Sequence, residues 1–150
     1  MADLRQADDD SIPPEERIYI RIPAVGDCVI QLEDGQSRPH GGSVQGPDAD
    51  EPKSVDLSSL STPDETRHRE TNGNFHVAAV SAEDVRRLGL RVVRDPITDG
   101  PIPNPAHALI VGSRRDAAGN YTGGLTQGEY SKLARAARYI VIAEQLGQQN

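Results

Sequence analysis

Two histidines stand at the start of apolar segments and have the clearest capacity for acid–base chemistry in this chain. His107 precedes the apolar run at 108–111, and His76 precedes the run at 77–80. An imidazole changes its charge near neutral pH, so it can act as a general base or as a general acid. If the two runs form adjacent strands, both rings could meet at one sheet edge and cleave RNA or bind a metal ion. The alternative is structural, with each ring buried and hydrogen-bonded to a backbone carbonyl.

Three residues near His107 are candidates for binding a phosphate-bearing substrate. Arg114 and Arg115 lie in a glycine-rich loop at 112–124 that leads to a predicted helix, and Asn104 lies shortly before His107. A flexible backbone and a helix N-terminus both favour anions. The Gly-Lys-Ser/Thr ending of a P-loop is missing, however, and the loop is too long for one. A plain connector between two elements is therefore the alternative.

No arrangement of metal-ligating residues is recognisable, and no cofactor is expected. His40 and His68 lie in a long polar segment, and Cys28 is the single cysteine. One cysteine also excludes a disulfide within the chain, and a reducing compartment is the default for such a protein. No stretch approaches the roughly 20 apolar residues of a membrane span. We therefore expect a cytoplasmic protein without a metal site or a membrane segment.

Charge is distributed unevenly along the 150 residues. Residues 1–75 contain 7 Lys/Arg and 16 Asp/Glu, whereas residues 76–150 contain 9 and 7, within a total net charge of −7. A face that binds nucleic acid without sequence preference needs a clear excess of positive charge. The first half has the opposite excess, and the second half is only weakly basic. The composition therefore argues against nucleic acid as a partner.

The N-terminal half is predicted to contain one hairpin between two polar segments. Residues 1–14 include three consecutive aspartates and two consecutive prolines, which predict a disordered tail. Apolar and polar residues alternate at 16–22 and at 28–32, as in two half-buried strands joined by a short turn. Residues 33–74 are rich in glycine, proline and charge, so we expect a mobile insertion with one short docked segment at 55–60.

Strands in the C-terminal half have clearer boundaries. They are predicted at 75–80, 90–94 and 106–111. The segment at 106–111 is apolar on both faces apart from His107, as expected of a central strand.

Two helices are predicted from their capping residues. Ser81 is a good N-cap for a short helix at 82–88, and Gly89 follows it as a left-handed C′ residue. Thr126 opens the second helix with Glu129 as its capping-box partner, and Gly147 ends it. Apolar residues recur at helical spacing in this second helix: Tyr130, Leu133, Ala134, Ala137, Ile140 and Val141.

These elements predict an α+β protein. Its mixed or antiparallel sheet has about five strands, with two helices on one face. We expect a disordered tail at 1–14, a single domain at 15–147 with the mobile insertion at 33–74, and a short tail at 148–150.

The second half of the chain also carries a recognisable pattern. It comprises Val80-Ser81, Gly89-Leu90, Val92-Val93, Asp95-Pro96, Pro105-Ala106-His107-Ala108, Ile110 and Gly112, followed by a Leu-Ala-rich helix. Over residues 80–145 this pattern resembles that of short uncharacterised bacterial accessory proteins. The resemblance implies a place in a defence or toxin-type gene cluster, and it implies no activity.

Two functions remain open from the sequence. The first is a small non-catalytic accessory or adaptor protein that binds a partner protein, because no catalytic motif is present and a flexible acidic segment can order on a basic partner. The alternative is a small hydrolase or nuclease that uses His107, with His76 assisting and Arg114 contacting a phosphate. The sequence leaves the partner, the substrate and the oligomeric state undetermined.

Overall fold

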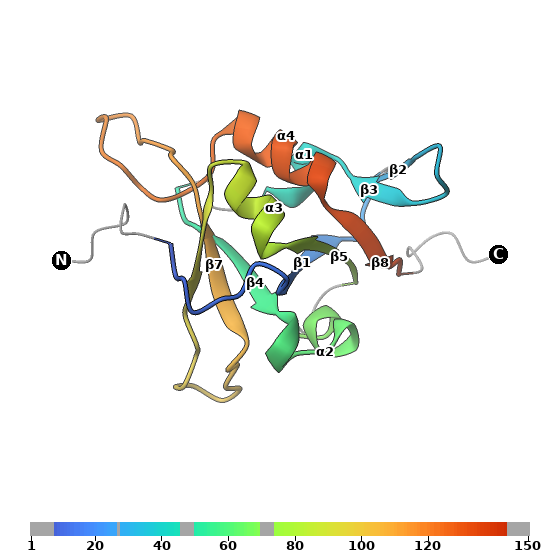
Figure 1. Cartoon of the computed structure of the whole chain (residues 1–150), viewed down its shortest axis with the longest axis horizontal. Coiled ribbons are helices and arrows are strands. Elements are labelled where there is room, and N and C mark those ends of the chain that lie inside the picture. Colours follow the sequence, from blue (N-terminus) through green and yellow to red (C-terminus); the bar gives the residue numbers. More distant parts are fainter. Residues whose placement is uncertain (1–7, 27, 46–49, 70–73, 144–150) are drawn as a thin grey trace.

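A computed structural model describes residues 8–26, 28–45, 50–69 and 74–143 and shows an α+β fold (Figure 1). A six-stranded sheet, antiparallel throughout, has the strand order β6-β7-β4-β1-β5-β8, and a separate two-stranded sheet pairs β2 with β3. The strands are β1 (Arg17–Pro23), β2 (Val29–Gln31), β3 (Ser37–Pro39), β4 (Lys53–Leu57), β5 (Phe75–Ser81), β6 (Arg91–Arg94), β7 (His107–Val111) and β8 (Arg138–Val141). The helices are α1 (Gly41–Val44), α2 (Pro63–Arg67), α3 (Ala82–Arg87) and α4 (Gln127–Ala136), with one 3₁₀ turn, η1 (Ser58–Leu60).

Strand β1 lies inside the large sheet because its residues suit burial on both faces. Ile18, Ile20 and Ile22 are fully buried on one face, and Tyr19 is buried on the other. The strand pairs with β4 along one side and with β5 along the other, where the register runs from Arg17 opposite Ser81 onward. Alternation of this kind is the period-two pattern of a strand between two packed layers.

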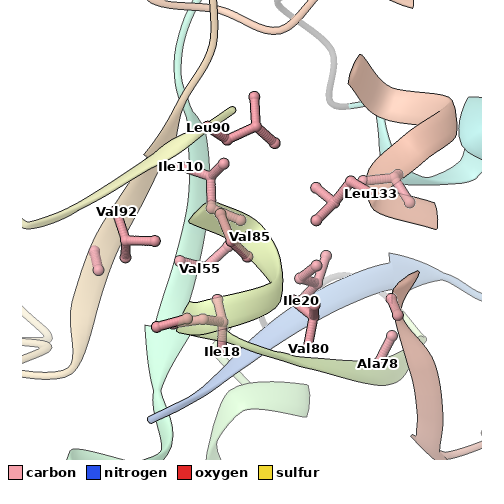
Figure 2. Close-up of a cluster of buried hydrophobic side chains, with 14 of the residues drawn as sticks. Ile18, Ile20, Val55, Ala78, Val80, Val85, Leu90, Val92, Ile110 and Leu133 are labelled. Carbon is pink, nitrogen blue, oxygen red and sulfur yellow. The ribbon is translucent and has the colours of Figure 1, made fainter. Parts of the chain in front are cut away.

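The main core lies between one face of the sheet and helices α1, α3 and α4. Figure 2 shows Ile18, Ile20, Val80 and Ile110 of the sheet pointing toward Val85 of α3 and Leu133 of α4. Helix α2 lies on the opposite side of the sheet (Figure 1). The expectation of an α+β fold is confirmed, although the large sheet has six strands and helices lie on both of its faces.

The capping residues act as the sequence predicts. The Ser81 side chain accepts a hydrogen bond from the Asp84 N–H at the start of α3, and Gly89 follows that helix with φ of 86°. Thr126 and Glu129 form a reciprocal capping box at the start of α4. Such caps satisfy backbone groups that have no partner inside the helix.

The expected mobile insertion at 33–74 is instead built into the fold. Its described residues form β3, α1, β4, η1 and α2, and β4 pairs with both β1 and β7. Val55 and Leu57 of β4 are buried in the main core. Contacts with residues far along the chain therefore stabilise this strand, although the sequence around it is polar. Residues 46–49 and 70–73 of this segment lie outside the described residues.

The expected disordered tail also needs correction for residues 8–14. Ile12 is 1% exposed and belongs to the main core, and the Asp9 N–H donates to the Val92 carbonyl of β6. Asp8 forms an ion pair with Arg86 of α3, with Nε 2.6 Å from Oδ2. Arginine partners outweigh the mutual repulsion of the aspartates on which the prediction depended. The predicted tails at 1–7 and 148–150 lie outside the described residues.

Two further elements differ from the sequence prediction. The predicted hairpin between 16–22 and 28–32 is absent, because β2 pairs with β3 in the small sheet. Helix α4 ends at Ala136, and the residues after it form β8, which pairs with β5 at the edge of the large sheet. Ile140 and Val141 are β-branched, so a free sheet edge overrides their helical spacing. Gly147, the expected helix end, is not among the described residues.

No helix in the described part of the chain combines the length and the apolar character needed to cross a membrane.

Candidate functional site

A pocket of about 230 Å³ lies on the face of the sheet that carries α2. Strands β1, β4 and β7 form its floor, and the end of α2 and the loop at 95–106 form its walls. Its lining consists of Tyr19, Arg21, Ser54, Val55, Asp56, Thr66, Arg69, Ile97, Ile102, Asn104 and His107. Among the sequence candidates, His107 and Asn104 therefore reach this pocket.

Asp56 is the centre of the polar network beside the pocket. It is 4% exposed, and its Oδ1 accepts a hydrogen bond from the Asn104 amide at 2.9 Å. Its Oδ2 accepts from the Thr66 hydroxyl at 2.8 Å and from Arg69 Nε at 2.9 Å. Arg69 also donates to the Ser61 hydroxyl at 3.0 Å. Both carboxylate oxygens are thus occupied, which suits a positioning role better than a reactive one.

Two opposing effects act on the pKa of Asp56. Burial is the larger single effect and would raise this pKa. Hydrogen bonds from Asn104, Arg69 and Thr66 together outweigh burial, so the pKa of Asp56 lies below its ordinary value. Asp56 is therefore an anion near neutral pH and holds Arg69 at the pocket wall.

His107 lies opposite Asp56 in the β7–β4 register, and Asp56 in turn lies opposite Tyr19 of β1. The His107 ring is largely buried, and its Nδ1 lies 2.8 Å from the Asp95 carbonyl oxygen. A carbonyl only accepts, so Nδ1 must carry the hydrogen. In the neutral ring, Nε2 then bears the lone pair and can accept a hydrogen bond or a proton from a ligand.

The rim of the pocket is apolar and exposed. Ile97 is 40% exposed and Ile102 is 62% exposed, and both belong to the proline-rich loop between β6 and β7. The Ile97 N–H donates to the Asn104 carbonyl and the Asn104 N–H donates to the Ile97 carbonyl, which closes the loop into a small hairpin. The Asn104 side chain also accepts from the Ala106 N–H while it donates to Asp56. These bonds fix the loop to the sheet beside the pocket.

The lining carries more positive than negative charge. Arg21 and Arg69 face a single acidic residue, Asp56, in a protein whose overall net charge is −7. The Arg21 guanidinium also lies over the Phe75 ring, 5.4 Å from its centroid. Because Asp56 pairs with Arg69, the charge of Arg21 gives the lining a net positive charge on an acidic protein, and this contrast favours an anionic ligand group.

The structure does not bring His76 to the pocket. His76 of β5 pairs with Ile22 on the core face, whereas His107 lies on the opposite face, with β4 and β1 between β7 and β5. Its Nδ1 accepts a hydrogen bond from the Ala143 N–H at 2.8 Å, and its ring packs edge-on against Tyr139. The suggested meeting of two imidazoles at one sheet edge is therefore absent.

His76 is fully buried and incompletely bonded. Because Nδ1 accepts a hydrogen bond, Nε2 carries the hydrogen of the neutral ring, and it has no hydrogen-bond partner within the described residues. Burial and, to a smaller extent, the charge of Arg67 lower the pKa of His76 below 6.5. This arrangement fits a neutral structural histidine.

The two arginines suggested as phosphate contacts lie elsewhere. Arg114 Nε lies 3.1 Å from Asp50 Oδ1, and Arg115 donates to the Gly119 carbonyl within its own loop. Neither residue lines the pocket. The glycine-rich loop instead packs closely on α4, where Ser113 donates two hydrogen bonds to the Glu129 carboxylate.

Several lining residues were missed as site candidates from the sequence. Tyr19 and Arg21 alternate with the three isoleucines of β1, so their position on the second face was readable from that pattern. Asp56 alternates with Val55 and Leu57 in the same way. Arg69 has no local signal, because its role depends on a strand that pairs far along the chain.

Within the described residues, no group of three or more His, Cys, Asp or Glu side chains is arranged to hold a metal ion. Comparison with known proteins adds no relative: no family model, no curated protein and no solved structure matches this chain.

Proposed function

We propose that this protein binds a partner protein and that the pocket beside His107 is the place where a segment of the partner docks. The observation that carries the proposal is the pair of exposed isoleucines, Ile97 and Ile102, at the rim of a pocket lined by Arg21 and Arg69. Exposed apolar side chains that lie together and are bordered by polar residues mark interaction sites.

The chemistry of the lining indicates the kind of segment that fits. An apolar side chain of the partner packs against the isoleucines, and an adjacent carboxylate enters toward the arginines. In the tautomer that places its hydrogen on Nδ1, the His107 ring offers Nε2 as an acceptor for a donor group of the partner. At about 230 Å³ the pocket is smaller than most small-molecule sites, which favours one side chain over a large ligand.

The test begins with co-purification under native expression at low salt, where products of neighbouring genes are the first candidate partners. The purified partner is then titrated against the wild-type chain, Ile102→Glu and Val25→Glu. Val25 is 72% exposed and does not line the pocket, so it supplies the matched control. We expect Ile102→Glu to weaken binding at least about tenfold and Val25→Glu to leave it unchanged.

Equal binding by the Ile102→Glu and Val25→Glu chains would refute the docking site. Recovery of the protein without a stoichiometric partner would refute partner binding itself.

A second candidate function has one specific observation in its favour. The Asp95 carbonyl fixes the tautomer of His107, and catalytic histidines are commonly oriented in this way. His107 would then be the general base of a small hydrolase or nuclease, with Arg21 and Arg69 beside an anionic substrate and without any part for His76. The test is hydrolysis of RNA and of bis(p-nitrophenyl) phosphate by the wild-type chain and by His107→Gln. Turnover that persists in His107→Gln, or no turnover in either chain, rejects this function.

A further inference from the structure

The outer edge of β6 is covered by residues 8–12, which we call the N-terminal strap. The Val92 N–H donates to Asp8 Oδ1 at 2.7 Å, and the Val92 carbonyl accepts from the Asp9 N–H at 3.0 Å. The Arg94 N–H donates to Asp9 Oδ2 at 3.2 Å. Strand β6 is an edge strand, so these backbone groups have no neighbouring strand to bond. Carboxylates of the strap take the place that a strand would occupy.

Two arginines extend the same surface. Arg86 of α3 donates from Nε to the Asp8 carboxylate at 2.6 Å, and from its terminal nitrogen to the carbonyls of Asp9 and Ile12. Arg94 of β6 donates from Nε to the Ser11 hydroxyl and from its terminal nitrogen to the Ser11 carbonyl. These side chains contact both the carboxylates and the carbonyl oxygens of the strap, which turns at Asp9, where the Ile12 N–H donates to the Asp9 carbonyl at 3.2 Å.

The Ile12 side chain adds an apolar contact to this surface, and we call the place that it fills in the main core the Ile12 socket. Ile12 is 1% exposed and packs in the main core with residues of the sheet and α3. The strap is thus held by two acidic side chains, by one backbone hydrogen bond to the strand edge, and by one apolar anchor. Charge pairing, a hydrogen bond to a strand edge and a buried apolar side chain are all means by which proteins capture peptide segments.

We infer that the β6 edge, with Arg86, Arg94 and the Ile12 socket, is a binding site for an acidic segment of a partner protein that adopts the same turn. The residues of the strap occupy this site in cis and show the chemistry of the ligand: two consecutive carboxylates followed, three residues after the second, by an aliphatic side chain. The site lies apart from the pocket beside His107, and the inference does not depend on the proposed function.

Competition with the strap decides how the site is tested. A tethered segment has an effective concentration near the millimolar range, so a free peptide must compete against it. The full-length chain is therefore weakened at the strap by Ile12→Asp and, independently, by the pair Asp8→Asn and Asp9→Asn. A fluorescent peptide with the sequence of residues 8–16 serves as the probe, and anisotropy reports its binding.

We expect saturable binding to both strap variants, at least about tenfold tighter than to the wild-type chain. Adding Arg86→Glu should abolish this binding, whereas adding Arg87→Glu should not, because Arg87 pairs only with Glu83 and Asp84 among the described residues. A peptide that carries Asp in place of its isoleucine should not bind. Amide hydrogen exchange shows which variants release the strap and stay folded. In such a variant the Val92 and Arg94 amides exchange quickly, whereas the Val80 amide stays protected. If one variant does not meet this condition, all three substitutions are combined.

Absence of saturable binding to a chain with free Val92 and Arg94 amides overturns the inference. Equal binding to the wild-type chain and the strap variants also overturns it, because the peptide then binds elsewhere.

Discussion

Arg69 Nε lies 2.9 Å from Oδ2 of Asp56, and this ion pair links the end of α2 to the floor of the pocket. Replacing Asp56 by Asn removes the charge and leaves the largely buried Arg69 without its counter-ion. Removing one partner of a buried ion pair leaves the other charge buried without compensation, which lowers the free energy of unfolding by more than the intact pair contributes to it. We therefore expect Asp56→Asn to lower the free energy of unfolding by about 3 kcal/mol at pH 7. Urea unfolding measures this change.

The matched control is Asp64→Asn in α2. The Asp64 side chain is 83% exposed, and its replacement should change the free energy of unfolding by less than about 0.5 kcal/mol.

The stabilisation by Asp56 should depend on pH. The pKa of Asp56 is lower in the folded than in the unfolded chain, so its contribution to stability is present above about pH 3.8 and is lost at lower pH. The difference between the wild-type chain and Asp56→Asn should therefore shrink on acidification below that value. A constant difference down to pH 2 would contradict this account.

His76 should make stability depend on pH below neutrality. Its pKa in the folded chain lies below 6.5, so the unfolded chain takes up a proton that the folded chain does not. Stability should therefore fall as pH decreases below about 6.5, by up to about 1.4 kcal/mol per pH unit, until the folded-state pKa is reached. His76→Leu should remove this part of the pH dependence. Unfolding curves at pH 7, 6 and 5 provide the measurement, and parallel profiles for the two chains would show that the assignment is wrong.

Ile12 should contribute to stability as a core residue. Ile12→Ala removes fully buried methyl groups, and we expect a loss of about 2–4 kcal/mol. Val25→Ala, at a position that is 72% exposed, should cost less than about 0.5 kcal/mol. Chemical denaturation compares the two variants with the wild-type chain. Equal stability of Ile12→Ala and the wild-type chain would restore the prediction of a disordered tail through residue 14.

Gly112 should not tolerate a side chain. A Cβ at this position would lie 2.6 Å from Glu129 Oε1, 2.7 Å from the Gly124 carbonyl oxygen and 2.8 Å from Leu125 Cα. Two of these atoms belong to backbone, so Gly112→Ala should destabilise the protein by about 1–3 kcal/mol. Gly42→Ala is the control, because nothing lies within 4 Å of its Cβ position in α1. Thermal unfolding should show a lower Tm for Gly112→Ala than for the wild-type chain, and no decrease for Gly42→Ala.

Local patterns in the sequence predict several elements correctly. Alternation defines β1, and the capping residues Ser81 and Thr126 place the starts of α3 and α4. The prediction fails where pairing partners lie far apart. Strand β4 has a short apolar pattern in a polar segment, and only its pairing with β1 and β7 makes it an inner strand.

The candidate site, too, could be predicted only where it depends on local sequence patterns. His107 was identifiable from its position before an apolar run, and it does line the pocket. Its neighbours Asp56 and Arg69 come from the segment predicted to be mobile, so only the β4–β7 register places them beside it. His76 has the same local pattern as His107, yet strand order and pleat place it on the other face. Residue type and local spacing cannot distinguish these two outcomes.

The place of β1 in the sheet has a consequence for synthesis. Its three isoleucines leave the ribosome before its neighbours β4 and β5 are made, with β5 ending at Ser81. At bacterial and eukaryotic elongation rates, β1 waits about 3–12 s for its longer neighbour. Until β4 has been made, β1 has no neighbouring strand, and until β5 follows, its apolar face has no complete core to join. The nascent chain is therefore most open to chaperone binding, and to self-association between neighbouring ribosomes, while the segment between β1 and β5 is being translated.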